Sequence, residues 1–317
     1  MAAAGGADAP SPPAPGERPP DGAAIGLLLG ALGAVGFSAK AVIIKLAYAY
    51  PVDAVTLLAL RMLFSLPFFA AMAVWSGRNH AYRMGRDDWI GILGLGFLGY
   101  YLASYLDFLG LQYIPAGLER LILFLYPTMV LLLSALVLRQ PITRLHVLAL
   151  ALSYGGIVLV FFDNLRLGES AGATALGSVL VFGSALAYAV YLVWGGGLIT
   201  RLGSVRFTAY AMSVASAFCI LQFVLTRPLS ALDLPAPVYG YSVLMAIVST
   251  VFPVWAVSEG IRRVGASRVA LVSAIGPVAT IFLGYLFLGE PITAIQLAGA
   301  TLVLAGVMML SLNKQRP

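Results

Sequence analysis

Long apolar runs alternate with short polar segments along almost the whole chain. Each run approaches or exceeds the roughly 20 residues that a helix needs to cross a bilayer. The connections are short, and the longest, Ser76–Asp88, leaves no room for an inserted soluble domain. The pattern therefore predicts ten membrane-spanning helices. They are expected at about Ala23–Ala49, Ala54–Trp75, Trp89–Leu109, Ala116–Leu138, Leu145–Phe162, Ala175–Ile199, Val205–Thr226, Val238–Ser258, Ala266–Leu288 and Ile292–Leu312.

Composition supports a membrane protein rather than a soluble one. Hydrophobic residues make up 61% of the 317 positions and charged residues only 10%, against roughly 25% charge in an average soluble protein. The expected fold class is therefore an all-α membrane protein. Residues 1–22 differ, because they are rich in proline and alanine and poor in large apolar side chains. Such a segment builds no core, so we expect a disordered tail there.

The chain also contains an internal repeat. When the sequence is shifted by 150 residues, the segment Ala116–Phe162 aligns with Ala266–Leu312 without a gap. The triplet Pro-Ile-Thr falls in register in both copies, at Pro141–Thr143 and at Pro291–Thr293. Chance matches between apolar residues explain shared leucines but not a shared turn of this kind. The sequence therefore predicts an internal duplication.

The two copies are expected at residues 23–162 and 173–312, with five spanning helices in each. Because five is an odd number, the second copy must enter the membrane from the opposite face. Inverted repeats related by a pseudo-two-fold axis in the membrane plane are typical of secondary transporters, whose substrate site lies near the midplane.

Charge distribution predicts the orientation. Of the 19 Lys and Arg residues, three lie inside spans (Lys40, Arg61 and Arg120) and three in connections on one face (Lys45, Arg166 and Arg227). The other thirteen lie on the face that carries both termini. Cytoplasmic segments are enriched in Lys and Arg, so both termini are expected in the cytoplasm, here of a bacterial inner membrane. The net charge of +6 is then a topology signal and requires no nucleic-acid partner.

Particular segments resemble a known family. Leu283–Leu310 and the helix before it, which carries Ala274–Pro277, are similar to the closing half of an EamA domain of the drug/metabolite transporter superfamily. Gly33–Leu46 resembles the first helix of that family, with Phe37 and Ser38 ahead of a lysine, Lys45, and Arg61 falls where the family tends to carry an arginine. The resemblance implies a transporter of small metabolites, often an exporter. The first copy departs from the pattern, with Leu138-Arg139-Gln140 where the second has Leu288-Gly289-Glu290.

Five ionisable residues fall within or at the ends of the first four spans: Lys40, Arg61, Asp107, Glu119 and Arg120. An ionisable side chain inside a membrane normally faces the bundle interior or a wet cavity. One interpretation is a vestibule whose surplus positive charge binds a carboxylate. The alternative is internal pairing, such as Arg61 with Asp107 and Lys40 with Glu119, which holds helices together.

Aromatic residues are the second set of candidate substrate contacts. Tyr101 and Tyr105 are four residues apart, Tyr188, Tyr191 and Trp194 recur at helical spacing, and Trp255 is the repeat equivalent of Tyr105. Such side chains combine an apolar body with a polar tip, which suits the wall of a cavity. The alternative is that they pack helices or anchor them at the membrane interface.

Two prolines are candidate hinges. Pro127 and Pro277 are repeat equivalents within the fourth and ninth spans. A proline inside a helix removes a backbone hydrogen bond and produces a kink. Matching kinks in the two halves are suited to rocking between inward-open and outward-open states.

These observations favour a secondary transporter that moves a small amino-acid-like or other carboxylate-bearing metabolite by alternating access, and the family resemblance implies outward movement. Partners are then the solute, the lipid bilayer, a coupling proton or ion bound through Asp107 or Glu119, and a second copy of the chain. A membrane scaffold or assembly subunit is the alternative. A channel predicts a continuous polar lining, which the sequence lacks. We expect no enzyme, because no nucleophile or metal pattern is present, and no cofactor or metal, because Cys219 is single and His80 and His146 lie beside charged loops.

Overall fold

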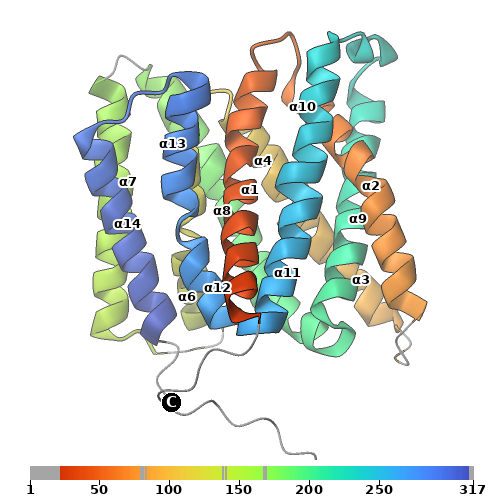
Figure 1. The fold of residues 1–317 in the computed structure, drawn as a ribbon, viewed down its shortest axis with the longest axis horizontal. Helices are drawn as coiled ribbons and strands as arrows, with labels where there is room; N and C mark the ends of the chain where they lie inside the picture. Colours follow the sequence, from red (N-terminus) through yellow and green to blue (C-terminus); the bar gives the residue numbers. More distant parts are fainter. Residues whose placement is uncertain are drawn as a thin grey trace, which may run out of the picture.

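The computed structural model describes residues 22–78, 82, 84–137, 139, 141–166 and 170–313, and all regular structure in this part of the chain is helical (Figure 1). The first half holds α1 (Ala23–Ala47), α2 (Ala54–Arg78), α3 (Arg86–Gly96), η1 (Phe97–Leu102), α4 (Ala103–Gly110), α5 (Ala116–Leu123), α6 (Tyr126–Val137) and α7 (Arg144–Arg166). The second half holds α8 (Ala171–Leu202), α9 (Ser204–Thr226), η2 (Leu229–Leu232), α10 (Ala236–Ala246), η3 (Ile247–Val251), α11 (Phe252–Val264), α12 (Ala266–Ser273), α13 (Gly276–Leu288) and α14 (Ala294–Asn313).

Nine segments of the described chain are long and apolar enough to cross a membrane, and a shorter apolar helix, Ala294–Leu310, follows them. The nine are Ala23–Ala47, Ala54–Gly77, Arg86–Gly110, Ala116–Val137, Arg144–Arg166, Ala171–Leu202, Ser204–Thr226, Ala236–Val264 and Leu271–Leu288. The helical fold class is confirmed. The expected tail lies, up to residue 21, outside the described residues, as do His80, Leu138 and Gln140.

Helix boundaries recur along the chain at the offset seen in the sequence. α2 and α9 begin 150 residues apart, and so do α3 and α10, α5 and α12, α6 and α13, and α7 and α14. Packing follows the same pairing: α2 packs against α9, and α7 against α14. α1 packs against α11, α12 and α13, as α8 packs against α4, α5 and α6. Figure 1 shows α7 and α14 at one edge of the bundle, α2 and α9 at the other, and α1 and α8 between them.

The repeated Pro-Ile-Thr triplet forms the start of a helix in both halves. Thr143 precedes α7, its hydroxyl accepts a hydrogen bond from the His146 N–H at 3.3 Å, and His146 Nδ1 accepts one from the Thr143 N–H at 3.3 Å. Thr293 precedes α14 in the same way and accepts from the N–H of Gln296 at 2.9 Å. A threonine in this position binds a backbone N–H that has no partner within the helix. The motif is therefore a helix cap.

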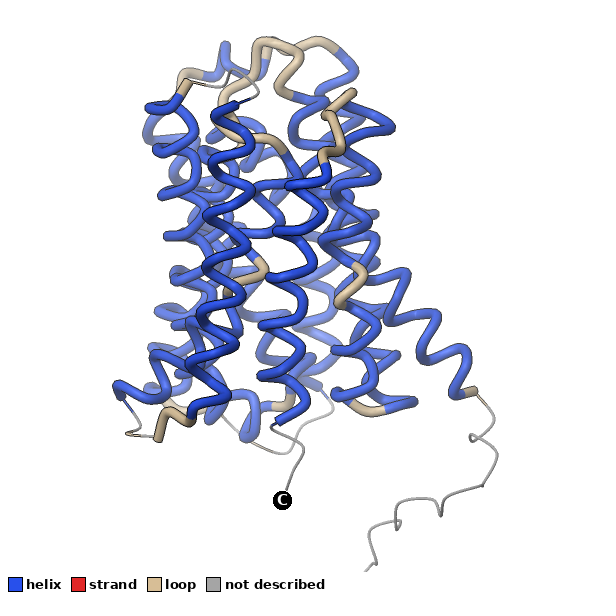
Figure 2. Tube along the Cα trace, turned by 90° about the vertical axis from the view of Figure 1, so that its left-hand side faces the viewer, coloured by secondary structure: helices blue, strands red, loops and turns tan. Residues whose placement is uncertain are grey.

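Both candidate hinge prolines lie beside complete breaks in a helix. Two residues separate the end of α5, at Leu123, from the start of α6, and Pro127 is the second residue of α6. α12 and α13 are separated in the same way ahead of Pro277. Ser38 Oγ of α1 donates a hydrogen bond to the carbonyl of Gly276, the first residue of α13, at 2.8 Å. Figure 2 shows such interruptions as loop within the helical bundle. A two-residue turn therefore divides the spanning segment ahead of each proline, and a hinge role for Pro127 and Pro277 stays a prediction.

The sequence analysis did not predict two π-helical segments. η1 and η3 are π-helices and occupy repeat-equivalent places between α3 and α4 and between α10 and α11. Proline does not explain them, because only η3 is followed by one, Pro253. In η3 the hydroxyl of Thr250 donates to the carbonyl of Met245, five residues earlier, at 2.9 Å. Wide turns of this kind are frequent at functional sites.

Candidate functional site

A cavity of about 380 Å³ lies in the middle of the bundle, between the two halves of the chain. α1 contributes Ala34, Phe37 and Lys40, which lie near the middle of that helix. Residues of the interrupted helix α5/α6 and of both π-helices also line the cavity. Its polar and charged lining includes Lys40, Arg61, Tyr100, Asp107, Arg120 and Thr250.

Lys40 joins two carboxylates from different helices. Its Nζ donates to Asp107 Oδ2 at 2.6 Å and lies 3.5 Å from Glu119 Oε1. Asp107 lines the cavity, whereas Glu119 is fully buried and is not part of the lining. The expected pairing of Lys40 with Glu119 is present, but the expected pairing of Arg61 with Asp107 is wrong. Lys40 takes Asp107 instead, and Arg61 contacts Phe108, the neighbour of Asp107 on α4.

Arg61 enters the cavity from α2 with no carboxylate within 4 Å among the described residues. Its Nε donates to Thr250 Oγ1 at 3.0 Å, which links α2 to η3 in the other half. Its guanidinium carbon lies 5.5 Å from the centre of the Phe108 ring, a cation–π contact. Nη1 is buried and has no hydrogen-bond partner. The guanidinium of Arg61 therefore has an unsatisfied donor beside the cavity.

Arg120 is the second cavity cation without a carboxylate partner in the described chain. Its Nε has no hydrogen-bond partner, and its Nη2 lies 3.0 Å from where a Cβ on Gly276 would stand. Glycine at the start of α13 therefore makes room for the arginine. With Lys40 shared by Asp107 and Glu119, the five predicted ionisable residues form one neighbourhood that holds three positive and two negative charges.

The predicted aromatic residues divide between the cavity and other places. Tyr188 lines the cavity. Tyr191 is buried behind it, with its hydroxyl 3.1 Å from that of Tyr100 and its ring stacked on Tyr188 at 5.6 Å. Tyr101 and Tyr105 stack on each other at 6.3 Å outside the lining.

The two tryptophans that were predicted to contact the substrate, Trp194 and Trp255, lie away from the cavity. The side chains of Trp194 and Trp255 are 47% and 57% exposed and are not in the cavity wall. Lining residues that the sequence analysis missed include Tyr100, Tyr126 and Thr250. Two of them were detectable, since Tyr100 is adjacent to Tyr101 and Tyr126 directly precedes Pro127.

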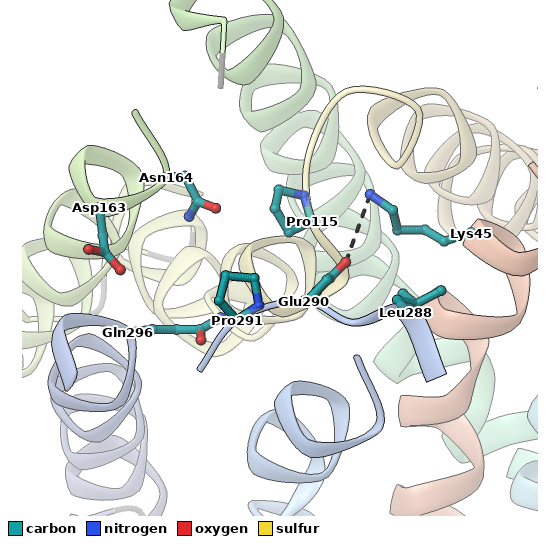
Figure 3. Close-up of a pocket in the computed structure, with 8 residues that line it drawn as sticks. All are labelled: Lys45, Pro115, Asp163, Asn164, Leu288, Glu290, Pro291 and Gln296. Carbon is teal, nitrogen blue, oxygen red and sulfur yellow. Dashed lines mark ion pairs between the residues drawn. The ribbon is translucent and has the colours of Figure 1, made fainter. Parts of the chain in front are cut away.

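A second cavity, of about 410 Å³, lies at the end of the bundle where α1 ends (Figure 3). Lys45 and Glu290 face each other across it at 3.8 Å, and Asp163, Asn164 and Gln296 form its other side. Lys45 Nζ also donates to the carbonyl of Ile114 at 2.9 Å.

Glu290 connects the two halves at this cavity. Its carboxylate accepts hydrogen bonds from the N–H groups of Ala116, at 2.8 Å, and Gly117, at 3.3 Å, the first two residues of α5. A carboxylate is stabilising at a helix N-terminus, where unpaired N–H groups and the helix dipole favour negative charge. Glu290 therefore fixes the start of α5, the helix that carries Glu119 and Arg120 at the central cavity.

The sequence profile of the EamA-like transporter family matches two parts of the chain, residues 24–162 and 175–312. Together these parts cover most of the sequence. The chain belongs to the EamA-like transporter family. This membership agrees with the resemblance found in the sequence and makes the protein an integral, multi-pass membrane protein of the transporter type.

Several EamA relatives are similar over most of their length. YcbK of Bacillus subtilis (strain 168), described as an uncharacterized transporter, is 32% identical over 284 residues, which are 87% of this chain and 89% of YcbK. The uncharacterized transporter sll1319 of Synechocystis sp. is 28% identical, over 82% of this chain and 80% of its own. The protein PecM of Dickeya dadantii is 24% identical, over 69% of this chain and 71% of PecM.

A solved crystal structure has the same fold as this EamA protein. The two superpose with a TM-score of 0.63 over 91% of this chain and 99% of the other, at 18% sequence identity. At that identity the likeness shows the fold alone.

Proposed function

We propose that the protein is a secondary transporter that moves a small carboxylate-bearing solute, such as an amino acid or another organic acid, out of the cell. The observation that carries this proposal is the central cavity, in which Arg61 and Arg120 hold guanidinium nitrogens without partners. A buried, unpaired cation is costly unless something compensates it. A carboxylate is the matching group, because it accepts charge-assisted hydrogen bonds from a guanidinium.

Aromatic side chains of the cavity supply the remaining contacts in this proposal. Phe37, Phe124, Tyr126 and Tyr188 line the same space as the two arginines. They offer apolar surface to the body of the solute while the arginines bind its carboxylate. A cavity of about 380 Å³ is large enough for a molecule of the size of an amino acid.

Alternating access is the mechanism we propose for movement. The repeated helix boundaries and the pairing of α2 with α9 and α7 with α14 support two inverted five-helix repeats around the cavity. Rocking of one repeat against the other would expose the cavity to each face in turn, with the breaks before Pro127 and Pro277 as hinges. The charge distribution supports cytoplasmic termini in a bacterial inner membrane.

Ligand binding tests the site. Purified protein in detergent is titrated with benzoate, which carries one carboxylate on an aromatic body. We expect Arg61→Gln and Arg120→Gln each to weaken benzoate binding about 10- to 100-fold, because a hydrogen bond to a charged group contributes about 1.5–3 kcal/mol. Arg144→Gln removes the same charge from an exposed position and should bind like the wild type. Equal affinity in all four proteins would contradict the proposed site.

Exchange across a membrane separates a transporter from a scaffold. Proteoliposomes loaded with unlabelled leucine, glutamate or succinate are placed in the same labelled solute. A transporter accumulates label transiently by exchange for at least one solute, and Arg61→Gln abolishes the exchange. A scaffold or assembly subunit gives no exchange beyond that of empty vesicles.

A further inference from the structure

A buried cluster of three ionisable residues borders the central cavity. Lys40 comes from α1, Asp107 from α4 and Glu119 from α5. The Lys40 ammonium lies 2.6 Å from Asp107 Oδ2 and 3.5 Å from Glu119 Oε1. Asp107 is 1% exposed and Glu119 is 0% exposed. One positive charge at the wall of the cavity therefore faces two buried carboxyl groups.

Glu119 is the member of this cluster whose carboxylate oxygens both lack hydrogen-bond partners. As ionised carboxylates, Glu119 and Asp107 leave both Glu119 oxygens and Asp107 Oδ1 without a hydrogen-bond partner. Asp107 is also the side chain to which a protonated Glu119 can donate a hydrogen bond. The charged groups that act on Glu119 are Asp107, Lys40 and its neighbour Arg120. Lys40 is already engaged at short distance by Asp107, and the Arg120 Nε is itself unpartnered. An ionised carboxylate in this position would be buried without the hydrogen bonds that normally stabilise one.

We infer that Glu119 carries a proton in the solute-free protein and keeps this proton while Arg61 and Arg120 bind the carboxylate. The inference rests on the proposed function, since it requires an anion in the central cavity. With Glu119 neutral, Lys40 and Asp107 form a balanced pair. The two arginines are then the uncompensated charges of the cavity.

The sign of the coupling follows from electrostatics. A carboxylate bound in the cavity adds negative charge near Glu119, which disfavours ionisation of Glu119 and retains its proton. Because coupling between two sites is reciprocal, the proton on Glu119 strengthens binding of the anion by the same factor.

Infrared difference spectroscopy tests the proton directly and needs no solute. We expect the wild type at pH 7 to show the carbonyl band of a protonated carboxylic acid, and Glu119→Gln to lack this band. Glu259→Gln is the matched control, because Glu259 pairs with Arg262 and Arg263 at distances of 2.6 and 2.7 Å, away from the cavity. Absence of the band in the wild type at pH 7, or its persistence in Glu119→Gln, would overturn the inference.

Benzoate binding at different pH values tests the coupling. Where Glu119 titrates, wild-type affinity should fall by about tenfold per pH unit as pH rises, as expected for linkage to one proton. Glu119→Gln imitates the protonated state, so its affinity should equal that of the wild type at low pH and stay constant. An equal pH dependence in both proteins would reject the coupling and leave the arginine site intact. If wild-type protein binds no benzoate, or binding ignores Arg61 and Arg120, the proposed carboxylate site fails instead, and the infrared band still decides the state of Glu119.

Discussion

Asp53 shows how a single polar residue organises the connection between two membrane helices. Its Oδ1 accepts hydrogen bonds from the N–H groups of Val55, at 3.0 Å, and Thr56, at 3.3 Å, and so caps α2. Arg227, in the connection after α9, donates from Nε to the same oxygen at 3.1 Å. The residue therefore combines a helix cap with a tie between the two halves.

Replacement of Asp53 by alanine is expected to lower the free energy of unfolding by about 1 kcal/mol at pH 7, because the cap of α2 is lost. The matched control is Asp233→Ala, since Asp233 is exposed and its side chain has no hydrogen bond within the described chain. Thermal unfolding in detergent measures the difference. Equal stability of both variants would contradict the capping role.

The same variant has a predicted pH dependence. Burial alone would raise the pKa of Asp53, but hydrogen bonds from Thr56 and the charge of Arg227 outweigh it and lower the pKa below the ordinary value of 3.8. A group with a lowered folded pKa stabilises the protein above its unfolded pKa and loses that contribution as pH falls through the folded value. The difference between wild type and Asp53→Ala should thus be constant near neutral pH and shrink below about pH 4.

At the residue scale, the sequence identified the charges of the site but not their partners. Lys40, Arg61, Asp107, Glu119 and Arg120 were found because charges are rare inside apolar runs. Which of them pair depends on the rotation of each helix about its axis and on which helices are neighbours. When the helices are apolar on all sides, hydropathy predicts neither the rotation of a helix nor its neighbours. Because helix rotation could not be predicted, Trp194 and Trp255 were grouped with Tyr188, although they lie outside the cavity.

Close backbone contact joins α7 to α14 at one edge of the bundle. A Cβ on Gly156 would lie 2.5 Å from the carbonyl oxygen of Gly299, and a Cβ on Gly306 would lie 2.5 Å from the carbonyl oxygen of Ala149. Small residues allow membrane helices to approach this closely. Gly155, the neighbour of Gly156 on α7, faces away, with nothing within 4 Å of its Cβ position.

The two adjacent glycines provide a matched pair of variants. Gly156→Ala should lower the free energy of unfolding by about 1–3 kcal/mol, because its methyl group forces the two backbones apart. Gly155→Ala should be neutral or slightly stabilising, since alanine favours helix more than glycine does. Thermal unfolding of both proteins in the same detergent measures the contrast. A larger loss in Gly155→Ala would contradict the packing of α7 on α14.

At the element scale, apolar runs located the spans but not their irregularities. The breaks before Pro127 and Pro277 had a local cause in the missing proline N–H, and they were predicted as kinks. The π-helices had no comparable signal, because η1 contains no proline and reads as an ordinary apolar helix. Their width depends on packing against α8 and α1, as at Gly99, where a Cβ would lie 2.3 Å from the Tyr191 ring. Such long-range contacts are not visible in a local window of sequence.

At the scale of the whole molecule, two similar halves meet around a space that neither encloses alone. The cavity takes Lys40, Arg61 and Arg120 from the first half and Tyr188 and Thr250 from the second. The duplication could be predicted from the register of the Pro-Ile-Thr triplets. The shape of the cavity could not, because it results from the docking of the halves.

Side-specific labelling of one cavity residue tests the proposed transport mechanism most directly. Cys219 is buried and is the single cysteine of the chain, so Cys219→Ala gives a background without thiols. Ser104→Cys then places one thiol in the cavity wall. In proteoliposomes of known orientation, we predict that this thiol reacts with a membrane-impermeant reagent added from either face, because alternating access would open the cavity to each face in turn. Reaction from one face only, or from neither, would contradict alternating access through this cavity.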